Sequence, residues 1–174
     1  MKPNVRALTR SAILAALAAV LLYLGAVVPS GRLALTAVAG LAALAVMLDF
    51  GGKWALGVCV VSALLSLLLS PAKGCAILYA AFLGWYPAVK CLIERVRPRA
   101  AQWAIKFALF NAAVLALYFL ARAVLNDAFS ALPESLPVWL LWLGANAVFL
   151  AYDLGLTGLI RIYVRRIAGK RNGV

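Results

Sequence analysis

Apolar residues dominate the chain in six long runs, and short groups of turn-forming residues separate one run from the next. A helix needs about 20 mainly apolar residues to cross the hydrocarbon core of a bilayer. The runs meet this length approximately at residues 10–28, 33–50, 53–70, 75–93, 101–125 and 137–163. The breaks between them are Pro29-Ser30-Gly31, Gly51-Gly52, Ser70-Pro71 with Gly74, Arg97-Pro98-Arg99, and Pro133 through Pro137. The pattern predicts an all-α, polytopic membrane helix bundle with six transmembrane helices, forming a single domain over residues 1–174.

Composition supports a membrane protein. Hydrophobic residues make up 67% of the 174 residues, whereas a soluble domain has roughly 45–50%. The first run follows three basic residues and so resembles a signal peptide. Because comparable runs continue to the end of the chain, we expect it to be retained as a span.

Basic residues give the expected orientation, because Lys and Arg collect in cytoplasmic loops. With the N-terminus in the cytoplasm, 14 of the 17 basic residues lie inside, and only Arg32, Lys73 and Arg122 lie outside. We therefore expect both termini in the cytoplasm and the protein in the cell membrane. The net charge of +12 has the same origin, and the basic segment 161–171 is interpreted as an orientation signal touching anionic lipid rather than as a nucleic-acid site.

The sequence contains no recognisable enzyme signature. It has no histidine, no paired acids at catalytic spacing, no glycine-rich phosphate loop and no serine in a nucleophile elbow. The three cysteines, Cys59, Cys75 and Cys91, lack metal-ligand spacing and are interpreted as apolar packing. We expect no enzymatic activity, no cofactor and no metal.

The first run carries small residues at four-residue intervals. They form two rows, Ser11/Ala15/Ala19 and Ala12/Ala16. Helices in lipid associate by close van der Waals packing, which small residues at this spacing permit. The rows are therefore a candidate docking surface for a partner helix, although packing against the second and third spans would explain the same alanines.

Polar and aromatic residues follow helical spacing in the last three spans. The rows are Tyr79/Tyr86/Lys90/Glu94, Asn111/Tyr118/Arg122, and Trp139/Trp142/Asn146/Asp153/Thr157. Such residues are costly against lipid and normally face the bundle interior or a wet cavity. We therefore expect the three rows to converge.

Depth divides the rows into two layers. The outer layer is a candidate small-molecule pocket with aromatic walls and few polar groups, formed by Tyr79, Tyr86, Tyr118, Arg122, Trp139, Trp142 and Asn146. The inner layer contains Lys90 and Asp153 at matching depths, and predicts a buried ion pair. A structural latch and a proton relay are the two interpretations of that pair.

Other roles stay open for the outer layer. Trp139 has the position of an interfacial anchor, and core packing explains Trp142, Tyr86 and Tyr118 equally simply. Arg122 either extends to the outer surface or meets an anionic ligand.

The layout resembles the substrate-binding S components of energy-coupling factor (ECF) transporters. Two stretches carry the likeness: Leu8-Thr9 through Ala19, which is similar to the family's opening, and Leu48-Asp49-Phe50-Gly51-Gly52-Lys53-Trp54-Ala55-Leu56-Gly57, which is similar to its turn between spans two and three. No substrate-specific motif of the known vitamin binders is matched, so the resemblance does not identify a ligand.

The resemblance implies partners and a mechanism. The alanine rows of helix one would pack on a membrane scaffold subunit driven by two cytoplasmic ATPases, and spans four to six with the first outer loop, Pro29–Arg32, would capture a vitamin or other micronutrient. A small structural or regulatory membrane protein without a ligand is the alternative, and a stand-alone channel or carrier is a third possibility.

Overall fold

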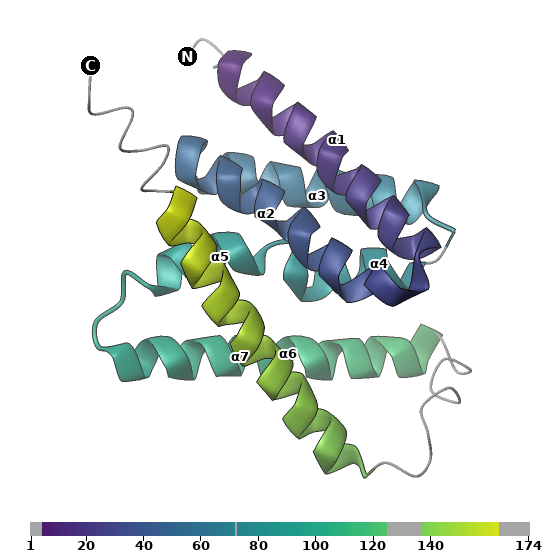
Figure 1. Cartoon of the computed structure of the whole chain (residues 1–174), viewed down its shortest axis with the longest axis vertical. Coiled ribbons are helices and arrows are strands. Elements are labelled where there is room, and N and C mark those ends of the chain that lie inside the picture. The colour runs from purple at the N-terminus through teal and green to yellow at the C-terminus, as the bar shows by residue number, and fades with distance from the viewer. Residues whose placement is uncertain (1–4, 72, 125–136, 164–174) are drawn as a thin grey trace. The chain divides into compact units, whose positions relative to one another are not determined.

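The computed structural model describes residues 5–71, 73–124 and 137–163, whose regular elements are helices (Figure 1). Six helical segments in these residues are long and apolar enough to cross a membrane, which confirms the six candidate spans. The chain divides into two compact units, Met1–Phe119 and Leu120–Val174, and each is described by itself. Lys2, the turn at 133–136 and the tail at 164–171 lie outside the described residues.

The first three helices are α1 (Val5–Val27), α2 (Arg32–Phe50) and α3 (Gly52–Leu69). One 3₁₀ turn, η1 (Pro29–Gly31), joins α1 to α2. Gly51 alone joins α2 to α3, with a φ angle of 92° that side-chain-bearing residues rarely adopt. Such short connections reverse the chain at each step, so α1 and α3 begin on the same side of the bundle (Figure 1).

Small residues form the core between these three helices. The buried cluster contains seven alanines of these helices together with a few larger side chains, among them Leu22, Val46 and Val58. A membrane interior provides little hydrophobic gain when apolar helices meet, so their association depends on close van der Waals packing. The alanines allow that packing because their short side chains let the helix backbones approach one another.

The fourth span is discontinuous, although its apolar run predicted one helix. It consists of α4 (Lys73–Leu78), the π-helical segment η2 (Tyr79–Leu83) and α5 (Tyr86–Ile93). The backbone N–H of Gly84 donates to the carbonyl of Tyr79 at 2.8 Å, five residues back, which gives the wider π turn. Pro87 has no N–H to donate to Leu83, four residues earlier, so the regular ladder stops there.

Side chains and close packing satisfy the backbone at this break. Cys59 Sγ on α3 donates to the carbonyl of Gly84 at 3.1 Å, and Trp85 Nε1 donates to the carbonyl of Ala81 at 3.1 Å. The carbonyl oxygen of Leu83 packs against Gly40 of α2, where a Cβ atom would overlap it. Unbonded backbone groups are costly in lipid, so these contacts explain how the break is tolerated.

Two long helices complete the described chain, α6 (Arg99–Val124) and α7 (Val138–Tyr163). The first unit includes α6 as far as Phe119. There the ring of Phe110 meets the ring of Phe82 edge-on, with centroids 5.4 Å apart, which ties α6 to the fourth span.

Candidate functional site

The two small-residue rows of α1 lie in different environments. Ser11, Ala15 and Ala19 are buried in the bundle, whereas Ala12 and Ala16 are exposed. The first row therefore provides the internal packing that was the alternative interpretation of these residues. The second row is the part of the predicted docking surface that a partner helix can reach.

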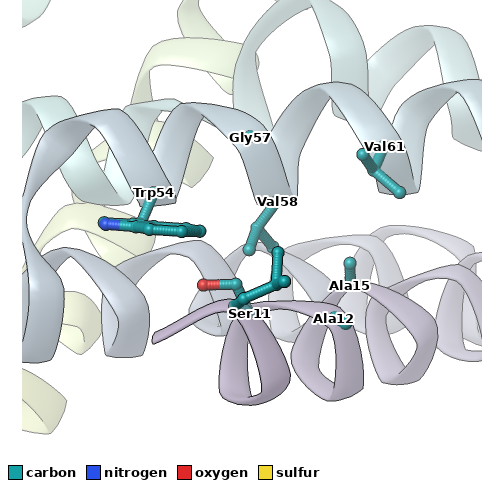
Figure 2. Close-up of a pocket in the computed structure, with 8 residues that line it drawn as sticks. Ser11, Ala12, Ala15, Trp54, Gly57, Val58 and Val61 are labelled. Carbon is teal, nitrogen blue, oxygen red and sulfur yellow. The ribbon is translucent and has the colours of Figure 1, made fainter. Parts of the chain in front are cut away.

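Ala12 of the exposed row borders a shallow apolar groove between α1 and α3. Figure 2 shows Ser11, Ala12 and Ala15 on one side and Trp54 and Val61 on the other. The groove has a volume of about 210 Å³, and on its α3 side Gly57 contributes no side chain. The sequence predicted the α1 residues of this surface but not the α3 residues. The available signal for α3 was the glycine at position 57, which lacks a side chain.

Tyr79 is fully buried in the first unit, at the start of the π-helical segment. Ser62 Oγ on α3 lies 2.9 Å from Tyr79 Oη and donates to the carbonyl of Val58 at 2.6 Å. The tyrosine hydroxyl thus bonds within the protein and ties the fourth span to α3. Tyr79 is therefore a packed core residue. Core packing is the interpretation that the sequence left open for Tyr86.

Tyr86 is also fully buried, at the start of α5. Its ring stacks on Phe82 at a centroid distance of 4.5 Å and an angle of 25°. Both tyrosines of the predicted outer layer that lie in the fourth span therefore form its packed side.

Lys90 joins an ionic cluster near the end of the fourth span. Lys90 Nζ lies 3.1 Å from Glu94 Oε1, one helical turn away, and Lys106 Nζ of α6 lies 3.0 Å from the same oxygen. Both lysines are buried, and Glu94 is about one-third exposed (32%). One carboxylate thus links the two helices and lowers the cost of burying two ammonium groups.

Neighbouring side chains reinforce this cluster. Lys106 Nζ lies 5.2 Å from the centre of the Trp103 ring, within the range of a cation–π interaction. Gln102 Nε2 donates to the carbonyl of Val96 at 2.8 Å, in the turn that leads into α6. Sequence reasoning placed Lys90 and Glu94 on one helical face but missed their pairing, for which the four-residue spacing was the signal, and missed Lys106.

The remaining predicted pocket residues lie on α6 and α7. Tyr118 contacts the ring of Phe119 at a centroid distance of 5.7 Å. Arg122 is on α6, outside the described side chains. The second unit carries the row of the sixth span along α7, with Trp139, Trp142, Asn146 and Asp153.

Local hydrogen bonds hold parts of that row against its own helix. Asn146 Nδ2 donates to the carbonyl of Trp142, and Thr157 Oγ1 donates to the carbonyl of Asp153, each at 2.9 Å. Convergence of the three polar rows would require contacts between the two units, and so would an ion pair between Lys90 and Asp153. Both therefore stay predictions.

Compared with known proteins, the chain matches no family model, no curated sequence and no solved structure.

Proposed function

We propose that this protein is the membrane-embedded substrate-capture subunit of an ECF-type importer for a vitamin or other micronutrient. In this proposal a scaffold subunit binds α1, two cytoplasmic ATPases drive the complex, and both termini lie in the cytoplasm of a bacterial cell. The observation that carries the proposal is the exposed row Ala12/Ala16, which remains outside the bundle while the other row of α1 is buried.

An exposed row of small residues suits a helix partner. Two helices attract in lipid only where their surfaces fit closely, and small side chains at four-residue spacing permit this fit. The six candidate spans and the strong bias of basic residues agree with the layout of an S component. The capture role rests on the resemblance and on the aromatic and amide residues of spans five and six.

Co-purification with partner subunits tests the docking claim. The double variant Ala12→Trp plus Ala16→Trp should abolish recovery of the scaffold and ATPases, because two indoles would hold the partner helix away. The matched control is Leu64→Trp plus Leu68→Trp, an exposed pair with the same spacing on α3, which should leave the complex intact. Intact assembly of the Ala12/Ala16 variant would refute docking at this row.

Native mass spectrometry of the purified chain tests the capture claim separately. A small molecule retained by the wild-type protein and lost after Trp142→Ala plus Asn146→Ala is the expected result. Retention unchanged by that double variant would refute the assignment of these two residues to the site.

One observation favours the alternative, a structural or regulatory membrane protein without a ligand. Tyr79 and Tyr86 are fully buried, with their rings packed and the Tyr79 hydroxyl bonded to Ser62. In that case the chain would carry no small molecule from any growth medium, and the Ala12/Ala16 variant would leave its associations unchanged.

A further inference from the structure

The turn between α5 and α6 carries three exposed arginines. Arg95, Arg97 and Arg99 alternate with Val96 and Pro98, so three positive charges stand within five residues. Among the described residues, none of the three guanidinium groups forms a hydrogen bond or an ion pair with the protein. The fold therefore does not use these charges internally.

The acidic residues of the first unit are already paired. They are Glu94, directly before the turn, and Asp49 at the end of α2. Glu94 Oε1 lies 3.1 Å from Lys90 Nζ and 3.0 Å from Lys106 Nζ, so two buried ammonium groups share its carboxylate. Asp49 Oδ2 lies 2.7 Å from a guanidinium nitrogen of Arg10. An anion that meets the three arginines must therefore come from outside this unit.

Hydrogen bonds hold the backbone of the turn in a defined conformation. The N–H of Arg95 donates to the carbonyl of Leu92 at 3.1 Å, and the N–H of Val96 donates to that of Ile93 at 3.0 Å. From α6, Gln102 Nε2 donates to the carbonyl of Val96 at 2.8 Å. A turn that is already ordered loses little backbone entropy when it binds a ligand.

The turn lies at the boundary of the two candidate spans that it connects. The fourth span ends at Ile93 and the fifth begins at Arg99, and Figure 1 shows the chain leaving α5 in an open loop before α6 begins. Polar headgroups border the hydrocarbon core at this level. Val96 and Trp103 are exposed there, and indole rings are enriched at membrane interfaces. Exposed apolar side chains beside the charges favour lipid over a water-soluble acidic protein.

Arginine suits the phosphate group of a lipid. Its guanidinium is planar, stays charged, and offers several N–H donors that match phosphate oxygens two at a time. We propose that this turn binds the headgroup of an anionic phospholipid through Arg95, Arg97 and Arg99, with Val96 and Trp103 against the adjoining acyl region. The site depends neither on the proposed transport role nor on the side of the membrane that the turn faces.

Native mass spectrometry of retained lipids tests the site. The purified chain is placed in nanodiscs with equal amounts of phosphatidylglycerol and phosphatidylcholine that carry the same acyl chains, and the lipids that stay bound after release are identified. The wild type should prefer phosphatidylglycerol. The triple variant Arg95→Gln, Arg97→Gln, Arg99→Gln should lower this preference more than about tenfold, since each basic residue near an anionic surface contributes about fivefold.

A matched control separates the turn from the overall charge of the protein. Arg6→Gln, Arg10→Gln, Lys53→Gln removes the same number of charges from exposed residues elsewhere in the first unit and should keep most of the preference. In detergent, the variant of the turn should melt at the wild-type temperature, because its three arginines form no bond within the described protein. Excess inorganic phosphate should not displace the lipid, since the free ion has no acyl chain to contact Val96 and Trp103.

Several results would overturn the proposal. Equal retention of the two lipids by the wild type, an unchanged preference in the variant of the turn, or an equal loss in the control would show that no lipid site exists at these arginines. A lower melting temperature of the variant in detergent would make them structural, and displacement by inorganic phosphate would make the site one for a free anion. Loss of a co-purifying protein without a change in bound lipid would assign the turn to an acidic partner. Because the lipid measurements use the isolated chain, they are independent of the partner test at Ala12 and Ala16.

Discussion

Gly40→Ala should destabilise the protein more than any other glycine-to-alanine change in the first three helices. The added methyl group would overlap the carbonyl oxygen of Leu83, and it would lie 3.3 Å from both the carbonyl carbon of Leu83 and Cγ of Pro87. The atoms it meets are backbone or a proline ring, which cannot rotate away. The change must therefore separate α2 from the fourth span.

The expected size follows from two opposing effects. Overpacking of a tight interior costs about 1–3 kcal/mol, and a contact with backbone belongs at the upper end of that range. Alanine regains about 1 kcal/mol of helix propensity over glycine, which leaves a net loss of about 1–2 kcal/mol. For a chain of this length the melting temperature should fall by about 2–8 °C.

Thermal unfolding in one detergent, followed by circular dichroism, measures this loss. Gly57→Ala is the matched control, because its methyl group would meet nothing within 4 Å and should leave the melting temperature unchanged or slightly higher. A Gly40→Ala protein as stable as the wild type, or a control that loses as much, would refute the close contact of α2 with the break.

Three further changes test other contacts of the first unit. Glu94→Gln should lower the free energy of unfolding by about 1–3 kcal/mol in a detergent unfolding titration, less than the loss of a fully buried pair because Glu94 is about one-third exposed (32%). An unchanged free energy of unfolding would show that the two lysines do not depend on its charge. Cys59→Ala should lower the free energy of unfolding by about 1 kcal/mol, because the Gly84 carbonyl loses its donor, and Cys59→Ser should restore most of that loss. Equal losses in the two variants would exclude the hydrogen bond as the cause. Arg10→Gln should change stability by no more than about 0.5 kcal/mol, because Arg10 is largely exposed, and a larger loss would mean that its bond to Asp49 is stronger than ordinary surface pairs.

The spans could be predicted because they depend on local properties of the chain. The length of each apolar run and the turn residues between runs need no knowledge of neighbouring helices, and the boundaries of α2 and α3 fall within one residue of the expected 33–50 and 53–70. Helical periodicity likewise separated the two small-residue rows of α1. Which row faces the bundle depends on the helices that pack against it, and the sequence left that choice open.

The break in the fourth span could not be predicted with the same means. Pro87 signals that a hydrogen bond is missing, but many transmembrane helices tolerate a proline without changing to a π turn. The turn is stabilised here by Cys59 and Gly40, which belong to α3 and α2. Those long-range contacts have no periodic signature. The Lys90–Glu94 pair, by contrast, was present in the four-residue spacing of its own row.

The contacts around the break bear on where a ligand can bind. Tyr79 and Tyr86 lie on either side of the discontinuity, and both rings are committed to packing within the described bundle. A ligand that used them would have to displace Ser62 from the first tyrosine or Phe82 from the second, at the cost of contacts that hold the fourth span together. A capture site therefore places less demand on the fold if its polar contacts come from the fifth and sixth spans.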